Sequence, residues 1–168
     1  MRKKGFTLVE MTIVIAILGI LLSISYINFT KSIIKSQMDS AANEVASMLK
    51  DVYENGNKSM DYNAYYLKIE KEEGTYKIKL FKNDKEVSVT EYKNIDLEIK
   101  WITQTENRTY EVQIENYIYF SSEGEAVLKY DKTQEGEGIN QIIIISKSKN
   151  VSKKITIESI PPGSIKVE

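Results

Sequence analysis

The pattern of apolar and polar positions divides the chain into three stretches. From Met11 to Ile27 no residue is charged. After Ile27, apolar residues recur at steps of three and four as far as Tyr53, which is the spacing of one helix face. From about residue 62 onward apolar and polar positions alternate, as they do in a strand with one buried face. The pattern predicts an α+β fold, with a long N-terminal helix packed on an antiparallel β domain.

The first stretch is long enough to cross a membrane. Residues 6–27 would span roughly 30 Å as a helix, about the thickness of the hydrocarbon core. Residues 28–56 form the amphipathic half of the same helix, and Asn55-Gly56-Asn57 is a stop signal that predicts a helix end near Glu54. The β domain is then expected over residues 57–168.

The alternating stretches predict strands separated by turn residues. Turn signals lie at Glu73-Gly74, Asn83-Asp84 and residues 105–107. The segment Gln141–Ser146 contains four consecutive isoleucines, so we expect it in the middle of the fold, covered on both faces. The expected strands with one wet face are 66–70, 76–80, 87–89, 95–101 and 110–114.

Composition excludes many kinds of site. The chain contains no Cys and no His, so disulfides, thiol catalysis, His/Cys zinc sites and imidazole acid/base chemistry are all ruled out. No nucleophile is paired with a base in the sequence, and we expect neither catalytic residues nor a cofactor. Without the three cations Arg2, Lys3 and Lys4, the remaining 20 Lys and Arg stand against 24 Asp and Glu. This balance gives no global attraction for nucleic acid.

Glu10 is the unusual residue of the apolar stretch, and three interpretations address it. A secretory signal peptide would be cut near Ser23-Ile24-Ser25. A plain signal anchor would leave the carboxylate in lipid, at a cost on the order of 3 kcal/mol near mid-membrane. Cleavage after Gly5 would instead give Phe6 a free α-amine about one helical turn from Glu10, either in the same chain or in a neighbouring subunit.

The residues Gly5-Phe6-Thr7-Leu8-Val9-Glu10, directly before an apolar helix, resemble the class III leader of type IV pilins and pseudopilins. The resemblance implies a leader at residues 1–5, cleavage between Gly5 and Phe6 by prepilin peptidase, and N-methylation of Phe6. It also implies that Glu10 acts in filament assembly. The implied partners are other pilin or pseudopilin subunits, the prepilin peptidase/N-methyltransferase, an inner-membrane assembly platform and membrane lipid.

The same segment also predicts the membrane topology of the chain. The basic residues before Gly5 place the N-terminus in the cytoplasm, with one pass through the cytoplasmic membrane and the C-terminal domain outside. After assembly the subunit would lie in a cell-surface filament. Many major pilins have a proline where this chain has Ile27, which favours a minor pilin or a pseudopilin here.

The second half carries another resemblance. Phe120 is followed four residues later by Gly124, and the chain closes with Gly163-Ser164-Ile165-Lys166-Val167. These features are similar to the β domain of H-type minor pseudopilins and FimT-like minor pilins, in which a strand ending in this way turns into a hairpin.

Two groups of charged residues are candidate binding sites. Asp131, Glu135 and Glu137 lie in an acidic, glycine-containing loop that offers oxygens to calcium, but its spacing matches no EF-hand and favours a solvated hairpin loop. A basic group near the C-terminus offers contacts to DNA phosphates, or is simply a solvated loop between two strands. Its members are Lys147, Lys149, Lys153 and Lys154.

The sequence therefore predicts a structural subunit of a type IV pilus, competence pseudopilus or type II secretion-like filament. One alternative is a filament-borne DNA-binding module for DNA uptake. Another is a monomeric signal-anchored surface protein, which would keep Met1 as its first residue.

Overall fold

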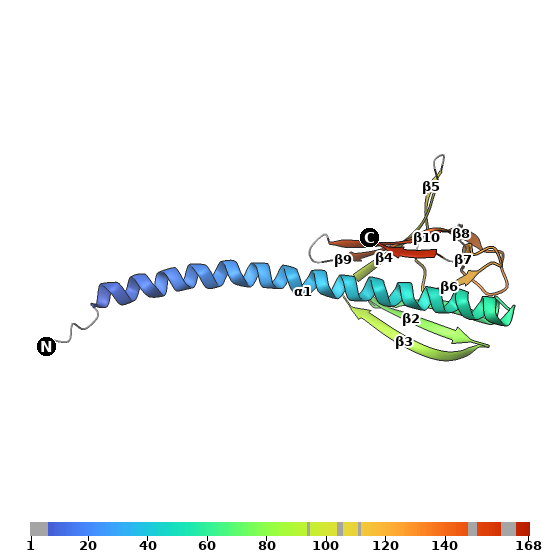
Figure 1. The fold of residues 1–168 in the computed structure, drawn as a ribbon, viewed down its shortest axis with the longest axis horizontal. Helices are drawn as coiled ribbons and strands as arrows, with labels where there is room; N and C mark the ends of the chain where they lie inside the picture. Colours follow the sequence, from blue (N-terminus) through green and yellow to red (C-terminus); the bar gives the residue numbers. More distant parts are fainter. Residues whose placement is uncertain (1–6, 94, 104–105, 111, 148–150, 159–163) are drawn as a thin grey trace. The chain divides into compact units, whose positions relative to one another are not determined.

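The computed structural model describes residues 7–93, 95–103, 106–110, 112–147, 151–158 and 164–168. The chain divides into two compact units, residues 1–36 and residues 37–168. Helix α1, Leu8–Ser59, contributes to both of them, and all described strands lie in the second unit (Figure 1). One long helix followed by antiparallel strands confirms the predicted α+β class.

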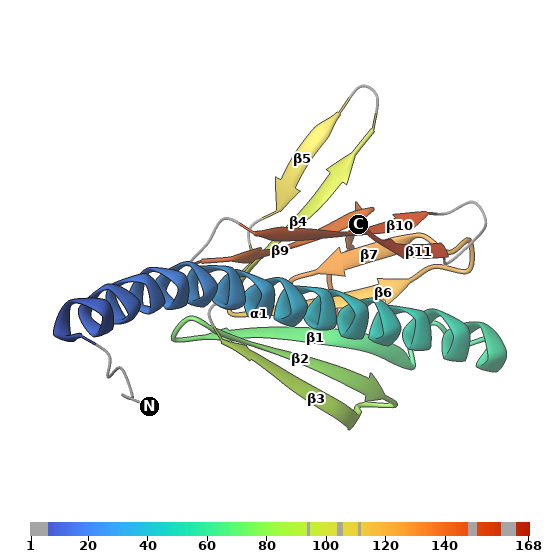
Figure 2. The ribbon, with the colours of Figure 1, turned by 60° about the vertical axis from the view of Figure 1, so that its left-hand side comes forward.

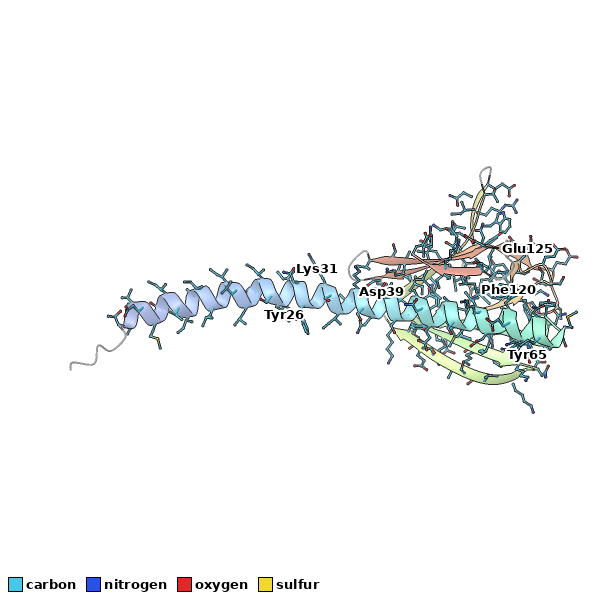
Figure 3. The ribbon with its side chains drawn as sticks, viewed as in Figure 1. Tyr26, Lys31, Asp39, Tyr65, Phe120 and Glu125 are labelled. Carbon is cyan, nitrogen blue, oxygen red and sulfur yellow. The ribbon has the colours of Figure 1, made fainter. Side chains whose placement is uncertain are left out.

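In the first unit, the side chains of α1 are exposed on every face of the helix. Leu8, Ile15 and Leu22 are more than half exposed, and Tyr26 and Lys31 extend away from the helix axis (Figure 3). The most apolar 18-residue window of α1 has a mean hydropathy of 2.4, and none of that window is buried. By length and composition α1 is able to cross a membrane.

In the second unit, α1 buries one stripe of side chains at the predicted spacing of three and four residues. The stripe is narrow and contains two alanines, so the backbone of the helix packs closely on the β domain. Its buried residues are Met38, Ala41, Ala42, Val45, Met48, Leu49, Val52 and Gly56.

Helix α1 ends at Ser59, beyond the predicted stop at Asn55-Gly56-Asn57. Gly56 is buried inside the last turns, where a Cβ would lie 3.1 Å from a ring carbon of Tyr62. The helix is closed by Met60, which has a positive φ of 56°. The Met60 N–H donates to the carbonyl of Asn57 and the Asp61 N–H donates to the carbonyl of Gly56. This is the Schellman arrangement, so the glycine of the stop signal serves close packing and a methionine takes the left-handed position.

We expect Met60→Gly to stabilise the protein by roughly 0.5 kcal/mol. The side chain of Met60 is 82% exposed and contributes little packing. A left-handed backbone costs a non-glycine residue about 1–2 kcal/mol, of which the greater chain entropy of glycine offsets a part. Thermal unfolding in detergent micelles, followed by the fluorescence of the single tryptophan Trp101, measures the change. Lys58→Gly, at a helical position two residues earlier, should instead lower the midpoint.

The strands form two antiparallel sheets in place of one continuous sheet. The six-stranded sheet has the order β3-β2-β1-β6-β7-β8, and the five-stranded sheet has the order β11-β10-β9-β4-β5. The first sheet is made of β1 (Tyr65–Glu72), β2 (Thr75–Lys82), β3 (Lys85–Lys93), β6 (Glu115–Phe120), β7 (Ala126–Lys129) and β8 (Glu137–Ile139). The second is made of β4 (Ile95–Ile102), β5 (Asn107–Tyr110), β9 (Gln141–Ser146), β10 (Ser152–Glu158) and β11 (Ser164–Val167).

The chain passes between the sheets three times, after β3, β5 and β8. Asn140 lies at the last passage, and its side-chain amide bonds both the N–H and the carbonyl of Ile102, at 2.9 and 2.7 Å. The hairpin of β4 and β5 projects beyond the other strands (Figure 2). The predicted turns Glu73-Gly74 and Asn83-Asp84 are confirmed, since all four residues have positive φ, as a two-residue type I′ hairpin turn requires.

Two strand predictions differ from the structure. Strand β9 is the middle strand of its sheet, as expected, but of its four isoleucines only Ile142 and Ile144 are buried, while Ile143 and Ile145 on the other face are partly exposed. Of the expected strand 110–114, Tyr110 is the last residue of β5, and the described residues 112–114 form no strand. Instead, the fully buried side chain of Asn116 bonds both the N–H and the carbonyl of Gln113 and bends this segment into a turn.

Strand β3 is the open edge of the six-stranded sheet, and none of its residues is buried. It begins at Lys85 and ends at Lys93, and its register with β2 shifts between Leu80 and Phe81. Terminal lysines and a bulge of this kind both discourage another strand from pairing with an edge.

Residues of the second half of α1 bind both sheets. The Glu44 carboxylate accepts hydrogen bonds from the hydroxyl groups of Thr90 and Tyr92 in β3, at 2.7 and 2.8 Å. On the other sheet, the ammonium group of Lys153 lies 2.6 Å from the Asp39 carboxylate. These polar contacts flank the buried stripe and fix the rotation of this part of the helix about its axis.

We expect the stability of the β domain to fall as the pH rises above 10. Burial, and then the neighbouring Glu44 carboxylate, raise the pKa of Tyr92 above its ordinary value of 10. Burial also raises the pKa of Tyr119 to about 12. A raised folded-state pKa gives a contribution that is complete below pH 10 and is lost as the pH increases, because the unfolded tyrosines ionise first. Thermal midpoints between pH 8 and 12 check this.

The matched variant for this effect is Tyr92→Phe. It should lower the midpoint at pH 8, because the bond to Glu44 is lost, yet show a shallower decline above pH 10. An unchanged slope in Tyr92→Phe would contradict the role assigned to this hydroxyl.

Candidate functional site

The first turn of α1 places Glu10 in a hydrogen-bonded cap. Oε2 of Glu10 accepts the backbone N–H of Thr7 at 2.8 Å and the Thr7 hydroxyl at 2.9 Å. In return, the N–H of Glu10 approaches the Thr7 hydroxyl oxygen at 3.2 Å. This reciprocal arrangement is a capping box, in which a Thr and a Glu three residues apart bind the unpaired N–H groups of a helix start.

The hydrogen bonds of the cap offset part of the free-energy cost of placing a carboxylate in an apolar segment. Glu10 also lies at the helix N-terminus, where the aligned peptide dipoles favour negative charge. Both bonds from Thr7 go to Oε2, and within residues 7–93 and the other described segments Oε1 accepts no hydrogen bond, which leaves it acceptor capacity there. Around this carboxylate the exposed side chains are apolar, among them Leu8, Val9 and Met11. A single acceptor in such a surface is suited to one cationic donor.

The predicted cleavage residues Gly5 and Phe6 lie outside the described residues. The contact between the Phe6 amine and Glu10 therefore stays a prediction. The capping box itself was not part of the sequence prediction, although the pattern Thr7-x-x-Glu10 before an apolar run is a recognised sign of it. Sequence reasoning treated Glu10 as a residue in need of a partner, and the structure supplies a first partner from its own helix turn.

The acidic loop does not gather its three carboxylates. Asp131 accepts bonds from the N–H and hydroxyl of Thr133, and Glu137 lies in β8. Among the described residues, no group of three or more His, Cys, Asp or Glu is placed to hold a metal ion. The neighbouring Lys132 binds Asp84 and the hydroxyl of Tyr66, which ties the loop to the hairpin of β2 and β3. Glu135 is exposed.

Only a glycine fits at position 136 of this loop, for a steric reason that the sequence does not reveal. A Cβ at this position would lie 2.1 Å from Cγ1 of Val127 and 2.9 Å from the carbonyl oxygen of Leu128. The glycine therefore allows the chain entering β8 to pass close to β7.

The described members of the basic group are all paired with carboxylates. Lys147 lies 3.5 Å from Asp96, Lys153 lies 2.6 Å from Asp39, and Lys154 lies 2.5 Å from Glu168. Lys149 is outside the described residues. These pairs reduce the positive potential that phosphate binding needs, so the arrangement gives DNA contact no additional support.

The comparisons with known proteins bear on the N-terminal segment. Residues 1–26 match the family model described as the prokaryotic N-terminal methylation motif. This segment is a type IV pilin-type leader, and it supports a type IV pilin-like prepilin that is processed by a peptidase and serves as a structural subunit. Together with the apolar helix that begins within it at Leu8, the segment is consistent with a membrane-anchored protein. No curated protein and no solved structure matches the chain.

The resemblance of the second half to H-type pseudopilins and FimT-like pilins stays a prediction. The two features that suggested it do have structural counterparts. Residues 121–125, with Gly124 at a φ of 83°, form the turn between β6 and β7, and Ser164–Val167 forms β11.

Proposed function

We propose that the chain is a minor pilin or pseudopilin of a type IV pilus, competence pseudopilus or type II secretion-like filament. In this proposal residues 1–5 are the leader, Gly5 precedes the cleavage site, and Phe6 becomes the N-methylated first residue. Residues 6–27 anchor the subunit in the cytoplasmic membrane, residues 28–56 carry the domain, and the β domain over residues 57–168 lies outside.

The observation that carries the proposal is the capped carboxylate at the start of an exposed apolar helix. Glu10 is held by Thr7 within the first turn, and its other oxygen has no hydrogen bond to any described residue. Cleavage after Gly5 would create a cation one residue before Thr7. A carboxylate in lipid gains most from such a counter-ion, and an amine from a neighbouring subunit would fix the axial register of two anchors packed side by side.

Several partners follow from this role. The leader would bind prepilin peptidase/N-methyltransferase, the anchor would meet an inner-membrane assembly platform, and the apolar helices of other subunits would replace lipid. The ion pairs of the basic group favour this structural role over a DNA-binding module.

The intact mass of the protein, isolated from membranes or sheared filaments, tests the proposal. We expect a species that lacks residues 1–5 and carries one additional methyl group. Gly5→Ala should leave the chain uncut. A native protein that begins at Met1 would reject the proposal and favour the monomeric signal-anchored surface protein.

A further inference from the structure

A groove in the β domain lies beside the projecting hairpin, and it belongs to none of the sites described above. Its volume is about 400 Å³, which is in the range of small-ligand sites. The end of β4, the turn between β6 and β7, and the ends of β9 and β10 contribute to its lining. Trp101, the only tryptophan of the chain, is part of that lining.

The indole ring of Trp101 packs against the neighbouring strand β8. A Cβ on Gly138 would lie 3.3 Å from Cζ3 of the indole, so this glycine lets the ring lie against the backbone of β8. Next to Trp101, the backbone of Ile102 is bound on both its N–H and its carbonyl by Asn140. Packing of the indole on Gly138 limits the motion of the ring before a ligand arrives, which reduces the entropy lost on binding.

Polar groups without protein partners share the groove with apolar ones. Ile139 and Ile157 contribute apolar surface. The hydroxyl oxygen of Thr156 is buried and has no hydrogen-bond partner within the described part of the chain. Glu125 lies in the turn between β6 and β7 (Figure 3), and its carboxylate makes no ion pair with any described residue, although most sheet carboxylates nearby are paired.

The lining restricts the class of ligand. No Lys or Arg lies among the described residues of the groove, which disfavours phosphates and other anions. A wholly apolar ligand would cover the Glu125 carboxylate without giving it a partner, which costs free energy. The lining has two carboxylates, but Glu158 is already paired with Lys166 at 2.8 Å and Glu125 is exposed, so the pair is a weak site for a further cation. A sugar ring fits a groove that has an aromatic ring and a carboxylate but no cation. Its C–H face covers the aromatic ring, while its hydroxyl groups both donate and accept hydrogen bonds.

We infer that this groove is a saccharide-binding site, with Trp101 as the stacking surface and Glu125 as an acceptor for sugar hydroxyls. The inference does not depend on the proposed filament role.

The test is a titration of the full chain with maltose and with N,N′-diacetylchitobiose. The protein is kept in phosphocholine micelles, because detergents with sugar headgroups would compete. We expect at least one of the two sugars to give a saturable change in Trp101 fluorescence and in calorimetric heat. Inorganic phosphate and putrescine should give neither.

Glu125→Gln should weaken sugar binding about tenfold, since it removes a charged acceptor. Glu123→Gln, an exposed carboxylate in the same turn but outside the groove, is the matched control and should bind as the unchanged chain does. Flat titrations with both sugars would overturn the inference. So would equal affinities of the two variants, or binding of putrescine in place of sugar.

Discussion

Replacing Glu10 with valine is expected to leave the precursor processed and inserted but to remove nearly all of it from filaments. The substitution makes the anchor more apolar, so membrane insertion should improve. It removes both the acceptor that caps Thr7 and the anion that would bind a Phe6 amine. Intact mass reports processing, and the amount of protein in the sheared filament fraction relative to membranes reports assembly.

Two further variants separate the cap from the charge. Thr7→Val removes the hydroxyl of the capping box but keeps the carboxylate, and a lost cap of this kind costs about 1 kcal/mol. It should reduce assembly only modestly. Glu10→Gln keeps an acceptor for the Thr7 N–H but carries no charge, so it should assemble almost as poorly as Glu10→Val. If Glu10→Gln entered filaments normally, the carboxylate would act only as a helix cap.

Gly136→Ala is expected to destabilise the β domain by about 2 kcal/mol, a typical cost of overpacking. The new methyl group would overlap Cγ1 of Val127, and the carbonyl oxygen of Leu128 blocks a shift in another direction. For a chain of this size the loss lowers the thermal midpoint by roughly 4–8 °C. Trp101 fluorescence in micelles follows unfolding of the domain.

The second-site variant Val127→Ala gives this prediction a control. In the double variant the nearest overlap is absent, so the two losses should not add, and the double variant should be more stable than their sum predicts. Gly19→Ala is the comparison outside the domain, because nothing lies within 4 Å of the added methyl group, and it should leave the midpoint of the domain unchanged. Additive losses would show that Val127 is not the obstacle.

Periodicity predicted the elements of this fold where local pattern and burial agree. The helix stripe from Met38 to Val52 and the two hairpin turns before β2 and β3 are of this kind. The helix end was missed because Gly56 packs against Tyr62, a contact that overrides the usual role of glycine as a stop. The predicted strand at 110–114 was wrong at residues 112–114 for a similar reason. The hydrogen bonds of the buried Asn116 side chain outweigh the alternating pattern there.

Long-range pairing was beyond local pattern. Alternation shows that a strand has one buried face but not which partner it takes, so the division into two sheets was not predicted. The basic group illustrates the same limit for charge, because Lys153 and Lys154 are adjacent in sequence yet bind Asp39 and Glu168, on elements far apart in the chain. For the candidate site the sequence did contain the signal, since Thr7 and Glu10 have the spacing of a capping box.

The open edge at β3 has a consequence for crowding. Between its terminal lysines and its shifted register, this edge offers a poor template for backbone pairing. Two domains brought close together would therefore not pair through their β3 edges into a continuous sheet. In the proposed filament, lasting order between copies would then depend on the packing of α1 rather than on strand pairing at β3.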